Sequence, residues 1–169
     1  MEIIVVGPGG EKIVRAFSAL GSHAAYITAV SQHTADDTYW EEVDLLYLTK
    51  GAVRQYGDSV KEMMRLARVY GTFVFSHAES ETAEKIDNVD FFVVDSERHD
   101  DVWTLSGVKV RMYPSVREVQ VQSGHWNGTI LLSEAAHAEV AIITFVDQLL
   151  RGKDFEVALQ TAGNRGTKI

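Results

Sequence analysis

Short apolar runs alternate with amphipathic segments through the first half of the chain, and this alternation restricts the fold more than any other feature of the sequence. Each run is rich in β-branched or aromatic residues, as buried strands are, and the segments between them repeat apolar residues at helical spacing. The predicted strands are residues 2–6, 25–30, 43–48, 72–75 and 89–94; the predicted helices are residues 13–20, 59–70 and 79–86, with a loop or short irregular helix at 32–42. Elements in this order predict a three-layer α/β/α fold with a mostly parallel sheet and right-handed crossovers.

The pattern changes between residues 101 and 132, where apolar residues alternate over shorter runs. These runs are predicted as antiparallel edge strands or a meander, at residues 108–113, 119–122 and 129–132. Residues 124–128, which begin and end with glycine, are predicted as a tight loop. The sequence thus predicts some antiparallel edge strands beside the parallel sheet.

The tail, residues 136–166, is predicted to form a helical hairpin. The first helix has one continuous apolar face, made of Val140, Ile142, Ile143, Val146, Leu149 and Leu150. Arg151 lies in its last turn, where a cation complements the helix dipole, and Gly152 is a natural C-cap. Asp154 can cap a second helix, whose inward residues are Phe155, Ala158, Leu159 and Ala162.

The composition restricts the class of partner and the compartment. The chain has 169 residues, so residues 1–169 are predicted as a single domain with a substantial core. A formal net charge of −8 argues against nucleic acid or an anionic membrane as the main partner, because both select basic surfaces. The absence of cysteine excludes disulfides and is consistent with the cytoplasm, which is the predicted location. No apolar run reaches the length of a membrane span.

Several segments carry signatures of a known family. L-L-R-G at 149–152 and E-V-A-L-Q-T-A at 156–162 follow each other as in the last two helices of the ribokinase-like (PfkB-type) carbohydrate kinases, and the tail resembles that family without a gap. G-G at 9–10 followed by A-F-S-A-L-G at 16–21 is similar to the family's substrate-side helix. The resemblance covers most of the chain in pieces. Family members are considerably longer, so it implies a truncated ribokinase-like domain that lacks the lid.

The resemblance implies a catalytic base and an anion hole at the start of the first tail helix. In the family this helix opens with G-A-G-D, whose aspartate is the base and whose glycines leave backbone N–H groups for the phosphoryl group. Ala136, His137, Ala138 and Glu139 fall on these four positions. Glu139 is therefore the implied base, and the three residues before it would contact the nucleotide phosphates.

The other nucleotide-side residues fall between positions 95 and 107. Asp95 and Glu97 lie in the segment that matches the family's N-x-x-E motif, where Arg98 replaces the glutamate, and their carboxylates would hold Mg²⁺. Gly107 ends T-L-S-G, a segment similar to the family's T-x-G nucleotide turn. The implied cofactors are ATP and Mg²⁺.

On the substrate side, Gly9, Gly10, Lys12 and His77 fall at or near the family's sugar-binding positions. The implied partner is a small sugar or nucleoside. Loss of the lid and of part of the nucleotide half should uncover sheet edge and apolar surface, so a homodimer is predicted.

Three functions remain open from the sequence. The first is an ATP-dependent sugar or nucleoside kinase, which transfers a phosphoryl group to an alcohol. The second is a catalytically inactive relative that serves as a binding or assembly module, because residues 133–139 favour a helix that would engage the N–H groups of the anion hole. The third is a dinucleotide-binding protein, suggested by G-P-G-G after the first strand, although Lys12 stands where that motif has its last glycine.

Overall fold

The computed structural model of the chain describes residues 1–28, 30–31, 33–78, 101–105, 108–113, 118–124, 126–132 and 138–167. Its contacts divide the chain into two compact units: unit 1 contains residues 1–94 and 103–106, and unit 2 contains residues 95–102 and 107–169. The single domain expected from the sequence stays a prediction. The helix expected at residues 79–86 and the strand at 89–94 lie outside the described residues.

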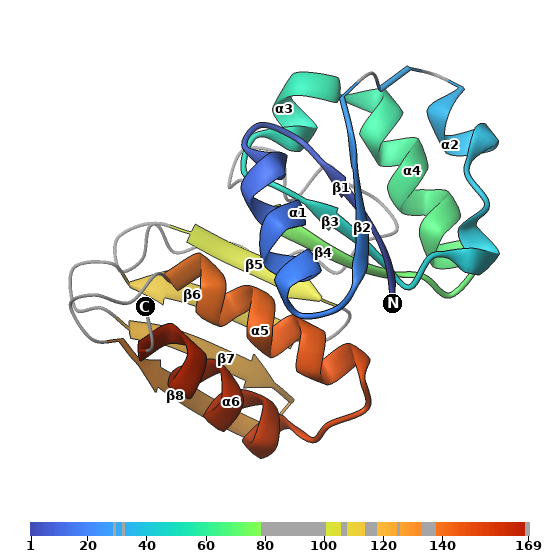
Figure 1. The fold of residues 1–169 in the computed structure, drawn as a ribbon. Coiled ribbons are helices and arrows are strands. Elements are labelled where there is room, and N and C mark those ends of the chain that lie inside the picture. The colour runs from blue at the N-terminus through green and yellow to red at the C-terminus, as the bar shows by residue number, and fades with distance from the viewer. Residues whose placement is uncertain are drawn as a thin grey trace. The chain divides into compact units, whose positions relative to one another are not determined.

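Unit 1 contains a parallel sheet of four strands in the order β2-β1-β3-β4 (Figure 1). The strands are β1 (Glu2–Val6), β2 (His23–Ile27), β3 (Leu45–Leu48) and β4 (Phe73–Ala78). The parallel sheet predicted for this half of the chain is confirmed. From β1 the chain returns to one side to form β2 and then crosses to the other side to form β3, so the strand order reverses between β1 and β3.

The helices of unit 1 are α1 (Gly10–Ala19), α2 (Thr34–Asp37), α3 (Ala52–Tyr56) and α4 (Asp58–Val69), with a 3₁₀ turn η1 (Trp40–Glu42). Successive strand residues face opposite sides of the sheet. On one side, Phe17 of α1 meets Tyr47 edge-on, with ring centroids 5.8 Å apart, and Tyr47 packs on Phe75 at 5.0 Å. On the other side, Met63 and Met64 of α4 join a buried cluster with the strands. Each large apolar side chain buried in this way contributes about 1.5–3 kcal/mol.

The sequence placed most elements of unit 1 within a few residues. β1 and α4 lie where they were predicted, and α2 and η1 are the short irregular helices expected between residues 32 and 42. β2 begins at His23 and ends at Ile27, so the predicted strand 25–30 was too late. The helix α3 was not predicted.

Unit 2 contains the antiparallel strands β6 (Val108–Tyr113), β7 (Glu118–Ser123) and β8 (Trp126–Leu131), whereas β5 (Asp101–Leu105) is divided between the units. The antiparallel strands were predicted. The loop expected at residues 124–128 is shorter, because Trp126 already pairs with Ser123 at the start of β8. Trp126 also stacks on Phe155 of the last helix, with ring centroids 4.9 Å apart, a favourable aromatic contact.

The helical hairpin of unit 2 confirms the prediction for the tail. Its helices are α5 (Ala138–Leu150) and α6 (Phe155–Thr167). Gly152, with φ of 82°, donates to Leu149 O at 3.0 Å, and Lys153 donates to Gln148 O at 3.1 Å, the two bonds of a Schellman C-cap. The carboxylate of Asp154 accepts a 2.9 Å bond from the Val157 N–H and caps α6.

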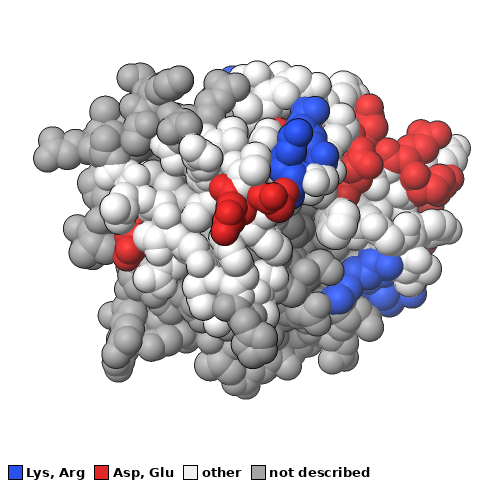
Figure 2. All heavy atoms as spheres, turned by 90° about the horizontal axis from the view of Figure 1, so that it is seen from below, with Lys and Arg blue, Asp and Glu red and all other residues white. Residues whose placement is uncertain are grey.

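Acidic and basic side chains are intermixed on the described part of the face seen in Figure 2, which shows no continuous basic patch there. Among the helices that the structure describes, none has the length and apolar character needed to cross a bilayer.

Candidate functional site

The carboxyl ends of the four parallel strands of unit 1 lie side by side. Val6 pairs with Ile27 and Leu48, and Leu48 pairs with Ser76, so these four residues form one row across the sheet. The next residues along each strand are Thr28, Gly7, Thr49 and His77. In open parallel sheets, ligands bind beyond the carboxyl ends of the strands, at the point where the strand order reverses. This point lies between β1 and β3, so Gly7 and Thr49 mark the centre of the candidate site, which we call the carboxyl edge.

The turn from β1 into α1 requires glycine for packing as well as for conformation. Gly7 has φ of 118°, and a Cβ added to it would lie 2.1 Å from Thr49 Oγ1. A Cβ added to Gly10 would lie 2.5 Å from Cε1 of Tyr26. Gly9, with φ of 75°, is the exception, because nothing lies within 4 Å of the position that a Cβ would take there. Of these glycines, Gly9 alone faces open space.

Tyrosine side chains hold the loops of the carboxyl edge together. The hydroxyl of Tyr26 donates a 2.8 Å bond to Gly7 O, while its ring lies against Gly10. The hydroxyl of Tyr56 donates to Thr28 O at 3.3 Å. Both bonds connect residues far apart in sequence, and they fix the β1–α1 turn and the end of β2 relative to their neighbours.

Thr49 has a buried hydroxyl without a hydrogen-bond partner in the part of the chain that the structure describes. The residue is 6% exposed, and its backbone N–H donates to Val6 O at 2.9 Å, which continues the ladder between β3 and β1. Its Oγ1 is the one buried side-chain polar atom that has no partner among the described residues. Buried polar groups are nearly always paired, and leaving one unpaired costs about 1–3 kcal/mol. Thr49 could not be identified from the sequence, because the isolation of its hydroxyl depends on the register between two strands.

The start of α1 offers a backbone donor to the same region. No side chain caps the helix at Gly9. The N–H of Gly10 donates to Gly7 O at 3.2 Å, and that of Lys12 donates to Gly9 O at 3.3 Å, both near the long limit for such bonds. Nothing in the described part of the chain accepts a bond from the N–H of Glu11. This N–H points along the positive end of the helix dipole, which favours an anion.

The structure brings the predicted substrate-side residues to one edge. Gly9 lies in the turn before α1, and Gly10 and Lys12 lie in the first turn of this helix. His77 lies in β4, one residue after Ser76, which belongs to the row of paired strand ends. Lys12 is exposed. Their binding role stays a prediction, and the contact of Gly10 with Tyr26 gives that glycine a packing role as well.

The residues predicted on the nucleotide side all belong to unit 2, and the structure describes only some of them. Ala138 is the first residue of α5, and Glu139 lies exposed in its first turn. Ala136, His137, Gly107, Asp95 and Glu97 lie outside the described residues. Within the described part of the chain, no three His, Asp or Glu side chains are grouped as metal ligands.

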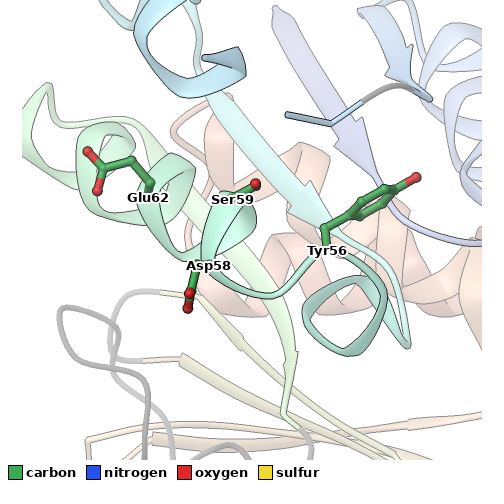
Figure 3. Close-up of a pocket in the computed structure, with 4 residues that line it drawn as sticks. All are labelled: Tyr56, Asp58, Ser59 and Glu62. Atoms are coloured by element: carbon green, nitrogen blue, oxygen red, sulfur yellow. The ribbon is translucent and has the colours of Figure 1, made fainter. Parts of the chain in front are cut away.

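A hollow of about 430 Å³ lies where α3 meets α4 and is lined by Tyr56, Asp58, Ser59 and Glu62. Figure 3 shows that Tyr56 and Glu62 point away from each other, so these side chains do not converge on a common point. Arg65 donates to the Glu62 carboxylate at 3.0 Å, and this bond lowers the pKa of Glu62 below its ordinary value. The carboxylate is therefore already engaged, and the carboxyl edge is the better candidate.

No protein family matches the sequence, and no curated protein matches it significantly. Membership of the ribokinase-like family stays a prediction.

Proposed function

We propose that the chain is a short ribokinase-like protein that binds a sugar or nucleoside at the carboxyl edge and transfers a phosphoryl group from ATP to a ligand hydroxyl. The observation that supports this proposal is the convergence of Gly9, Gly10, Lys12 and His77 on one edge of a parallel sheet, where the strand order reverses. These residues were selected from separate segments of the sequence. We also propose the finer fold, a single three-layer ribokinase-like domain without a lid.

In this proposal Glu139 accepts the proton of the attacking hydroxyl. It lies in the first turn of α5, where the helix dipole favours negative charge on a phosphoryl group. Ala136, His137, Ala138 and Gly107 are the proposed contacts of the nucleotide. Asp95 and Glu97 would hold Mg²⁺, because carboxylate oxygens are ligands that this ion prefers, and the ion would neutralise phosphate charge.

A catalytically inactive binding or assembly module is the second candidate, and the packing of the glycine turn favours it over a kinase that must hold a sugar there. Tyr26 already fills the space over Gly10, and the N–H groups of Gly10 and Lys12 are engaged within the turn. A turn that satisfies most of its own donors has fewer left to hold a sugar hydroxyl.

Thermal unfolding with Mg·ATP and with a panel of neutral sugars and nucleosides separates the two candidates. A kinase is stabilised by both ligands through mass action, whereas a module is stabilised at most by the second. For any sugar that is phosphorylated, Glu139→Gln should abolish turnover, and Glu156→Gln, which changes an exposed glutamate at the start of α6, should preserve it. Equal turnover in both variants would remove Glu139 from the role of base.

The predicted homodimer is tested by sedimentation at micromolar concentration. A monomer there would contradict it.

A further inference from the structure

We propose that the carboxyl edge binds an oxyanion, the phosphate or carboxylate group of a small ligand, between the first turn of α1 and the hydroxyl of Thr49. This inference rests on the proposed ligand site and specifies the chemical class of the ligand. It does not require phosphoryl transfer.

The direction of the Thr49 hydroxyl supports this proposal. Thr49 follows the last residue of β3 and continues its ladder with β1 through its N–H bond to Val6 O, so strand alternation places it on the same side of the sheet as Tyr47, which contacts Phe17 of α1. Its Oγ1 lies against the Cα of Gly7, in the space that a side chain at position 7 would occupy. The hydroxyl is therefore aimed at the underside of the turn that opens α1.

Hydrogen-bond acceptors are scarce around the first turn of α1 in the described part of the chain. The Thr49 hydroxyl and the Glu11 N–H are two donors without an acceptor in the described part of the chain. Gly7 O already accepts from both Tyr26 and Gly10, so it is poorly placed to serve a further donor. An oxyanion supplies several acceptor lone pairs at once, and bonds to a charged acceptor contribute more than neutral ones.

The charges around the turn allow an anion despite the acidic composition. Lys12, in the first turn of α1, is exposed. Glu11 is the opposing charge on the same turn and is also exposed. The helix dipole adds partial positive charge, so the sum at the start of α1 favours an anion.

Binding requires the turn to move, because Gly7 covers Oγ1 of Thr49. The bond from the Gly10 N–H to Gly7 O is 3.2 Å long and is the contact that must open. Its opening would release the Gly10 N–H to the ligand as a third donor. Gly7 and Gly9, both at positive φ, give the turn the conformational freedom for this change.

The test uses the full chain and inorganic phosphate, with acetate as the carboxylate probe and chloride at matched ionic strength as the reference. Phosphate or acetate is expected to raise the unfolding midpoint and to shift the amide resonances of Gly10 and Glu11. Thr49→Val removes the hydroxyl and should weaken binding, so that the Kd rises roughly ten- to a hundredfold. Thr49→Ser keeps the hydroxyl and should retain binding. Thr72→Val changes a buried threonine at the start of β4 and should also retain it.

The relative strength of the phosphate and acetate responses identifies the group. No response to either anion, or an equal Kd in wild type and Thr49→Val, would overturn the inference. The outcome is separable from the proposed kinase activity. A phosphate response without any response to Mg·ATP removes the transfer reaction and supports the oxyanion site. Stabilisation by neutral sugars but by neither anion retains the ligand site and removes the oxyanion.

Discussion

Replacement of Thr49 by valine is expected to stabilise the ligand-free protein. Valine has nearly the shape of threonine, and the substitution removes a hydroxyl that is buried without a partner. Burial of such a group costs about 1–3 kcal/mol in protein mutational data. No partner is lost in exchange, because nothing in the described part of the chain bonds to Oγ1. The free energy of unfolding should therefore rise by about 1 kcal/mol or more, with a matching rise of roughly 2–4 °C per kcal/mol in the midpoint.

Thr72→Val is the matched control, because Thr72 is buried to a similar extent but fully bonded. Its exposure is 5%, against 6% for Thr49. Its hydroxyl lies 3.1 Å from Trp40 O and 3.1 Å from Val43 O, and its single hydrogen is shared between them. Valine at this position removes the hydroxyl donor of Val43 O, while Trp40 O still accepts from the Val43 N–H, so the free energy of unfolding should fall by about 1–3 kcal/mol. The two substitutions are chemically identical, and only the bonding of the hydroxyl differs.

Urea unfolding of the two variants and the wild type, in a buffer without phosphate or carboxylate, measures both changes. The midpoint should move in opposite directions while the slope stays constant, since neither substitution changes the surface exposed on unfolding. A Thr49→Val variant that is destabilised as much as Thr72→Val would refute the reasoning. It would show that the Thr49 hydroxyl has a partner in the folded protein.

Other substitutions test other contacts. Gly10→Ala should lower the free energy of unfolding by about 1–3 kcal/mol, because its Cβ would overlap the ring of Tyr26; an unchanged melting curve would contradict the close approach. Asp154→Ala removes the cap of α6 and should cost about 1 kcal/mol in urea unfolding; no loss would mean that the cap is redundant. The hydrogen bond from Arg65 lowers the pKa of Glu62, so this pair stabilises the protein at neutral pH and is lost as the pH falls through that pKa. The small stability difference between wild type and Glu62→Gln should accordingly vanish in acid, and a difference that grows there would reverse the assignment.

The parallel sheet could be predicted because its strands are short apolar runs bounded by glycine. β1 is such a run and was placed without error. β2 begins with His23 and two alanines, which carry little periodic signal, so the prediction moved to the more β-branched residues that follow. α3 has five residues between two glycines, fewer than two turns, and is too short for helical periodicity to show.

The start of β8 illustrates a different limit of sequence reasoning. Asn127 and Gly128 are residues typical of turns, and Gly124 precedes them, so a loop was the natural prediction. In the structure their backbone pairs with β7, and Trp126 stacks on Phe155. A tertiary contact with a helix almost thirty residues away overrides the local preference. Local composition could not reveal it.

The candidate site, too, could be predicted from the sequence only in part. The glycine turn after β1 was visible in the sequence, because glycines between a strand and a helix indicate positive φ or a close approach. The reason for each glycine was not visible. Gly7 is needed because of Thr49, and Gly10 is needed because of Tyr26, residues that lie far from the turn in sequence. The unpaired hydroxyl likewise arises only once β1 and β3 are in register.

The tail hairpin has its helix caps and hydrogen bonds in place, whereas the carboxyl edge contains an unpaired buried donor among the described residues. This difference favours the carboxyl edge as the functional site. The hairpin has its C-cap bonds, its N-cap and an ion pair from Arg151 Nε to the buried carboxylate of Asp147 at 2.9 Å, which together specify a stable connection. The carboxyl edge combines a turn at positive φ with a buried donor that lacks an acceptor, both around Gly7 and Thr49. A backbone turn at positive φ and a buried donor without an acceptor both reduce stability. Such features persist together where binding or catalysis depends on them. The Thr49 hydroxyl lacks an acceptor in the described part of the chain. A ligand with several acceptor atoms is therefore the simplest molecule that would satisfy it.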